Sequence, residues 1–94
     1  NYVVISSIWG SSDFGAVTWG NGTTGISGTV SSSNSLVGST AFDTVGYGGV
    51  TALTNGNYVV NSSIWGSSSF GAVTWGNGTT GISGTVSSSN SLVG

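Results

Sequence analysis

The feature that most constrains this chain is an internal repeat with a period of 56 residues. Residues 1–38 and 57–94 are copies that differ at only two of 38 positions, namely Ile5/Asn61 and Asp13/Ser69. Residues 39–56 occur once and connect the copies. Because near-identical segments share local preferences, we expect both copies to adopt the same backbone. We read the chain as two partial repeats and the connecting part of the repeat, belonging to a longer array.

The residue types within each repeat predict an all-β fold. Eighteen glycines are spread along the chain, and each interior glycine costs a helix about 1 kcal/mol relative to alanine. Val, Ile, Thr, Tyr and Trp fill the apolar runs, which favours strands. We expect four strands per repeat: one over residues 49–53 of the connecting segment, and three in the second copy over residues 58–64, 71–75 and 82–86, the last extending toward Leu92. In the first copy the equivalents are residues 2–8, 15–19 and 26–30.

Two Asn-Gly pairs per period predict tight hairpins. Asn55-Gly56 joins two expected strands, and Asn77-Gly78 joins the strands at 71–75 and 82–86, which should then be antiparallel neighbours. Four antiparallel strands in about 56 residues match one blade of a β-propeller. A β-solenoid or a fibre of stacked sheets is the alternative. In each case a single repeat leaves a sheet face uncovered, so repeats need one another.

A family resemblance supports the propeller-like interpretation. Residues 43–63 read DTVGYGGVTALTNGNYVVNSS, which resembles the FG-GAP repeat of integrin-α-type β-propellers, with Val45-Gly46 in place of Phe-Gly. The residues Leu92-Val93-Gly94 resemble that family's Leu-x-Gly strand end. The family's acidic calcium loop has no counterpart at residues 54–57, so the resemblance implies no bound calcium. The chain also resembles repeats of large secreted bacterial surface proteins of the adhesin or haemagglutinin type, which implies an extracellular array.

The charge count excludes several classes of function. The chain has no Lys, Arg, His or Cys, and its only carboxylates are Asp13 and Asp43. Nucleic-acid binding depends on Lys and Arg, and no apolar run approaches the roughly 20 residues of a membrane span. Nucleophile–base pairs and metal sites lack their usual residues. We therefore expect no enzyme, no cofactor, no metal, no nucleic-acid partner and no membrane insertion, and we interpret both aspartates as turn or capping residues.

The four tryptophans are the best candidates for ligand contact, and they are Trp9, Trp19, Trp65 and Trp75. Exposed aromatic rings can stack on sugars, but each tryptophan can also bury 150–250 Å² and fill a core poor in large side chains. Three asparagines, Asn21, Asn61 and Asn77, match the Asn-x-Ser/Thr glycosylation pattern, although Asn also serves turns.

These observations favour a structural segment of an extracellular, self-associating fibre or surface array. Its partners would be neighbouring repeats or further copies of itself. The alternative is a lectin-like adhesive module that binds glycans through exposed Trp and Asn. Edge strands normally carry charge that blocks association, and this chain is only 2% charged.

Overall fold

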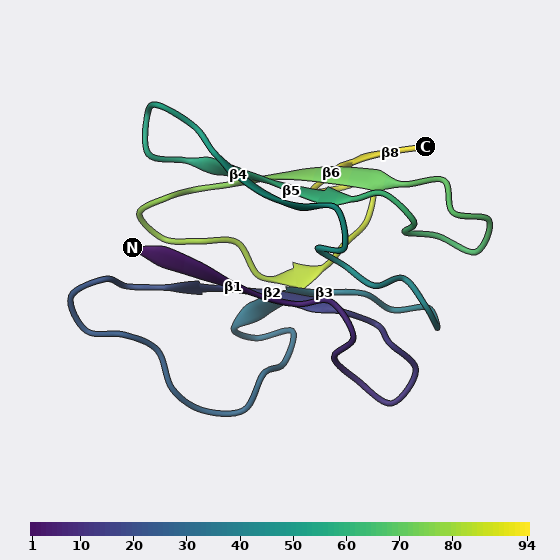
Figure 1. The fold of residues 1–94 in the computed structure, drawn as a ribbon, viewed down its shortest axis with the longest axis horizontal. Coiled ribbons are helices and arrows are strands. Elements are labelled where there is room, and N and C mark those ends of the chain that lie inside the picture. The colour runs from purple at the N-terminus through teal and green to yellow at the C-terminus, as the bar shows by residue number, and fades with distance from the viewer.

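The computed structural model describes all 94 residues and contains eight β-strands and no helix. The strands form two four-stranded sheets that lie one above the other as two layers (Figure 1). The all-β prediction is therefore confirmed. No segment forms a helix long and apolar enough to cross a membrane.

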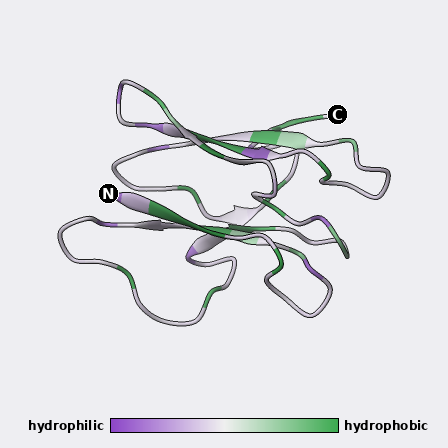
Figure 2. Ribbon diagram, in the orientation of Figure 1, coloured by the Kyte–Doolittle hydropathy of each residue, from purple (hydrophilic) through white to green (hydrophobic).

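Each copy of the repeat builds most of one sheet. The first sheet has the order β1-β2-β3-β7, with bounds Tyr2–Ser6, Ala16–Gly20, Ser35–Val37 and Gly84–Thr85. The second sheet has the order β4-β5-β6-β8, with bounds Gly49–Ala52, Tyr58–Ser62, Ala72–Gly76 and Leu92–Val93. All pairs are antiparallel except β3 with β7, which is parallel. Figure 2 shows hydrophobic stretches on the strands of both layers.

The two copies pair their strands in the same register. Tyr2 lies opposite Gly20 in the first sheet, and Tyr58 lies opposite Gly76 in the second. A Cβ atom at either glycine would overlap the tyrosine ring across from it. The glycine that ends β2 and β6 thus provides the space in which the cross-strand tyrosine lies.

The hairpin predicted at Asn55-Gly56 is present, since β4 and β5 pair across it. Gly56 has a φ of 91°, a conformation that glycine adopts without a steric penalty.

The hairpin predicted at Asn77-Gly78 is wrong. Neither residue has the positive φ that a two-residue hairpin turn requires. The Asn77 Oδ1 atom instead accepts hydrogen bonds from the amides of Thr79 and Thr80 at 2.8 and 3.4 Å, and the Asn77 carbonyl accepts one from Gly81 at 2.7 Å. This local turn directs the chain away from β6.

The strand predicted at residues 82–86 is therefore only partly correct. Its ordered part, β7, covers two residues and pairs in parallel with β3 of the other sheet rather than with β6. The antiparallel neighbour of β6 is β8, further along the chain. In the first copy, residues 26–30 form no strand at all.

The core lies between the two layers. Seven buried residues form it: Val17, Leu36, Val45, Tyr58, Val60, Ala72 and Val86. Val17 and Leu36 come from the first sheet, whereas Tyr58, Val60 and Ala72 come from the second. Val45 comes from the connecting segment. Most of the apolar burial thus depends on contact between repeats and not on packing within one repeat.

Candidate functional site

The two sheets are built from equivalent copies of the repeat, but they contact each other through opposite faces. Because side chains alternate along a strand, each sheet has a tyrosine face and a tryptophan face. We define the tyrosine face by Tyr2, Val4, Ala16 and Thr18 and their copies Tyr58, Val60, Ala72 and Thr74. The tryptophan face contains Val3, Val17, Trp19 and Leu36 and their copies Val59, Val73, Trp75 and Leu92. The tryptophan face of the first sheet packs on the tyrosine face of the second.

The exposures of equivalent residues follow from this stacking. Val60 is 0% exposed within the contact, whereas its copy Val4 is 45% exposed on the free face of the first sheet. Leu36 is 0% exposed, whereas Leu92 is 79% exposed on the free face of the second sheet. The two apolar faces that fit each other in the middle of the molecule are therefore repeated on its two outer sides, where parts of them are exposed, although Ala16 and Thr18 of the outer tyrosine face are buried.

Trp19 anchors the contact between repeats. Its indole Nε1 donates a hydrogen bond to the Gly78 carbonyl at 3.2 Å, and the Asn1 Nδ2 donates to the same oxygen at 2.6 Å. Gly81 lies so close to Trp19 that an added Cβ would be 2.6 Å from the Trp19 Cβ. Its copy, Trp75, is half-exposed on the free tryptophan face.

Trp9 and Trp65 lie outside the strands and are half-buried. Trp65 packs against the core, and its indole Nε1 is buried without a hydrogen-bond partner. The structure therefore does not gather the four tryptophans into one site. It places Trp19 between the repeats and Trp75 at the equivalent free position.

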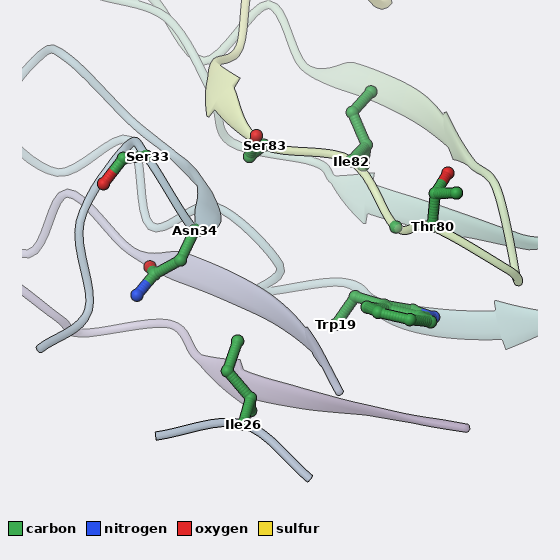
Figure 3. Close-up of a pocket in the computed structure, with 8 residues that line it drawn as sticks. Trp19, Ile26, Ser33, Asn34, Thr80, Ile82 and Ser83 are labelled. Carbon is green, nitrogen blue, oxygen red and sulfur yellow. The ribbon is translucent and has the colours of Figure 1, made fainter. Parts of the chain in front are cut away.

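A cavity of about 220 Å³ opens beside Trp19 at the edge of the contact (Figure 3). Its lining comes from both copies: Trp19, Ile26, Ser33, Asn34, Thr80, Gly81, Ile82 and Ser83. The figure shows Thr80 and Ile82 on one side of the Trp19 ring and Ile26 on the other. One aromatic ring and several hydroxyl and amide groups therefore share one cavity.

The candidate glycosylation residues have different surroundings. Asn77 stabilises the turn at residues 77–81 through its side chain. Asn21 stabilises the equivalent turn in the first copy, where its Oδ1 accepts hydrogen bonds from the amides of Thr23 and Thr24 at 2.8 and 3.3 Å. Asn61 is exposed on β5, opposite Gly49 and Val73.

Asp43 links the connecting segment to the second copy. Its carboxylate is buried and accepts three backbone hydrogen bonds, from Ser39 and Thr40 at 3.0 and 2.9 Å and from Gly66 at 3.0 Å. This confirms its interpretation as a capping residue. Asp13 has a φ of 54°, and Ser69 has 55° at the same place in the other copy, so Asp13 is a turn residue.

The sequence did not predict the hydrogen bond between Asp43 and the Gly66 amide, because the two residues lie 23 positions apart and no local pattern connects them. The one available signal was that Asp43 is the only charged residue in the connecting segment.

Comparison with known proteins adds one finding. Residues 1–47 and 52–94 each match a family described as a repeat of unknown function, DUF5650. The two matches agree with the two copies seen in the structure. No curated protein and no solved structure matches the chain.

Proposed function

Because the chain belongs to the family of DUF5650 repeats, we propose that it is a structural segment that builds an extracellular array by stacking repeat on repeat. The observation that carries this proposal is the contact between its own two sheets. Several residues buried there have an exposed copy on an outer face, as Leu36 and Leu92 or Val60 and Val4 illustrate. The outer faces are therefore complementary to each other, and a further repeat can cover either one.

The chemistry of the surface supports the same proposal. Large apolar side chains, including Tyr2, Val4, Val73, Trp75 and Leu92, are exposed on the two outer faces, and contiguous apolar patches mark interaction surfaces. No Lys or Arg is present to prevent association of sheet edges. Their absence also removes all trypsin cleavage sites, which suits a protein that functions outside cells.

The order β4-β5-β6-β8, an antiparallel sheet within one period, supports a blade-like repeat. Stacking of one face on the opposite face of the next sheet is heterologous, so it forms either a closed ring or an open array. Both outcomes are structural assemblies of repeats, and both fit the proposed role.

Analytical ultracentrifugation of the 94-residue chain over a range of concentrations tests the proposal. We expect concentration-dependent oligomers that dissociate on dilution. The matched control is Leu92→Asn, which places a polar group on the free tryptophan face without altering the core. We expect this variant to shift toward monomer. The proposal would be contradicted if the unsubstituted chain, called the parent chain below, stayed monomeric at all accessible concentrations.

Carbohydrate binding at the cavity beside Trp19 is the second candidate. An aromatic ring with hydroxyl and amide groups around it is a common chemistry for sugar recognition, and Trp19, Asn34 and Thr80 provide it. A glycan-array screen tests this candidate, with Asn34→Ala as the variant expected to lose any signal. Sugar binding that is unchanged in that variant would place the ligand elsewhere.

A further inference from the structure

The contact between the repeats includes a strand that one copy contributes to the sheet of the other. β7 belongs to the second copy in sequence, but it lies at the edge of the first sheet, parallel to β3. Gly84 is opposite Leu36 and Thr85 is opposite Val37, and the Val86 amide donates to the Val37 carbonyl at 3.0 Å. Val86 is buried in the core as a result. Stacking of repeats is therefore combined with strand addition.

The equivalent segment of the first copy, residues 28–30, holds nearly the same conformation without any partner strand. Gly28 has a φ of 114° and Gly84 has 106°. The Asn34 Nδ2 donates to the Thr29 carbonyl at 2.9 Å, as the Asn90 Nδ2 donates to the Thr85 carbonyl at 3.0 Å. A segment already held in its paired conformation loses little entropy on binding.

This segment has a backbone amide that forms no hydrogen bond within the chain. Thr29 is exposed, and the Val30 amide donates no hydrogen bond within the chain. The copy of that amide, at Val86, is the one that bonds to β3. The donor that would attach residues 28–30 to a sheet edge is thus free.

A matching sheet edge is present at β8. Leu92 and Val93 pair with β6 in the register in which Leu36 and Val37 pair with β2. The far side of β3 carries β7, whereas β8 is the last strand of its sheet. β8 lies in the upper layer of Figure 1, and the loop containing residues 28–30 lies below the lower layer. The free segment and the free edge are on opposite sides of the molecule.

We propose that residues 28–30 of one chain add as a parallel strand to β8 of a second copy of this chain. In that register Gly28 lies opposite Leu92, Thr29 lies opposite Val93, and the Val30 amide donates to the Val93 carbonyl. The proposal rests on the proposed stacking function and defines its contact. Each chain then has one donor side and one acceptor side, so assembly has a direction.

If two chains stack as the two sheets do within one chain, a second contact forms between them beside the added strand. Trp75 of the chain that provides β8 takes the place that Trp19 has within the chain, and the Gly22 carbonyl of the chain that provides residues 28–30 takes the place of Gly78. Val45, which fills the contact inside the chain, has no counterpart between two chains. The contact between chains is therefore weaker than the internal one.

Disulfide trapping tests the register directly, because the chain has no native cysteine. Paired residues on neighbouring strands lie within the Cα separation of about 4.4–6.8 Å that a disulfide spans. With Thr29→Cys and Val93→Cys in one chain, we expect a ladder of covalent multimers on a non-reducing gel. The matched control is Thr29→Cys with Thr51→Cys, which tests the opposite edge of the second sheet at β4, and we expect no ladder from it.

The possible outcomes separate this proposal from the stacking function. Covalent multimers from the cysteine pair at positions 29 and 93 (the 29/93 ladder), without multimers from the pair at positions 29 and 51, support strand addition at β8. Oligomers in the ultracentrifuge without a 29/93 ladder overturn strand addition but leave stacking intact. A monomeric parent chain and no ladder overturn both. Equal ladders from the two cysteine pairs also overturn the proposed register.

A proline variant provides a second measurement. Val30→Pro removes the amide that would donate to Val93, while that amide has no partner inside the chain. We expect at least a tenfold weaker association with an unchanged circular dichroism spectrum. The control, Ser32→Pro, places proline two residues away, where no strand pairing is proposed, and should associate like the parent. Equal association of both variants would contradict the proposal.

Discussion

Leu36 and Leu92 occupy the same position in two near-identical repeats, yet one is completely buried and the other is 79% exposed. Both lie on short strands, β3 and β8, and pair with a valine of the neighbouring strand, Val17 or Val73. The difference arises only because the first sheet has a second repeat stacked on its tryptophan face. Position in the stack, and not sequence, decides which residues form the core.

The two leucines provide a matched pair for stability. We expect Leu36→Ala to lower the free energy of unfolding by about 2–5 kcal/mol, the usual cost of a buried Leu→Ala change. Leu92→Ala should cost less than about 0.5 kcal/mol, as exposed substitutions do. Urea unfolding in dilute solution measures both. Equal losses from the two substitutions would show that the sheets are not stacked as described.

Asp43 is expected to stabilise the junction between the connecting segment and the second copy. Asp43→Ala removes an acceptor of three backbone hydrogen bonds, and we expect a loss of about 2–3 kcal/mol, since a bond to a charged group contributes about 1.5–3 kcal/mol. The control is Asp13→Ser, which installs the residue that the second copy already has at Ser69 with the same φ. Thermal unfolding should show almost no change for this control.

The sequence predicted the strands best where local preferences are strong. The β-branched run at residues 58–64 and the Asn55-Gly56 turn both lie in the hairpin of β4 and β5. The identity of the copies led to the expectation of one backbone, and the pairs of β1 with β2 and β5 with β6 have equivalent registers.

The sequence could not predict pairings that depend on the stack. The segment at residues 28–30 and its copy, β7, have the same residues, but only β7 has a sheet edge beside it. No local preference distinguishes them. The hairpin at Asn77-Gly78 was predicted wrongly because Asn-Gly pairs often form two-residue hairpin turns. In the structure the Asn77 side chain instead accepts hydrogen bonds from the amides of Thr79 and Thr80 and forms a different turn. The positions of Trp19 and Trp75 differ for the same reason as those of the leucines.

Tyr58 should make the stability of the chain depend on alkaline pH. Burial raises the pKa of Tyr58 above its ordinary value of 10.0, and a backbone hydrogen bond with Ile82 acts weakly in the opposite direction. Below pH 10 the folded and unfolded chains both keep the phenol proton, and the contribution of Tyr58 is complete. Above pH 10 the unfolded chain loses this proton first, so the free energy of unfolding falls until the raised pKa is reached.

Urea unfolding at pH 8 to 11 in dilute solution measures this effect. We expect Tyr58→Phe to lose less stability than the parent chain as the pH rises, since it has no phenol to ionise. Tyr2→Phe is the matched control at the equivalent position of the free tyrosine face, and it should keep the alkaline loss of the parent. If Tyr58→Phe and the parent lost stability in parallel, the buried position of Tyr58 would be contradicted.

Gly25 and Gly81 test the contact between the repeats with a single added methyl group. Both have a left-handed φ, 74° and 77°, so alanine at either position costs about 1–2 kcal/mol in backbone strain. At Gly25 the added Cβ meets only the Tyr2 hydroxyl at 3.7 Å, but at Gly81 it collides with Trp19. Overpacking adds about 1–3 kcal/mol, so Gly81→Ala should destabilise the chain more than Gly25→Ala by that amount. Chemical denaturation of the two variants measures the difference, and equal losses would show that Trp19 does not pack on the second copy.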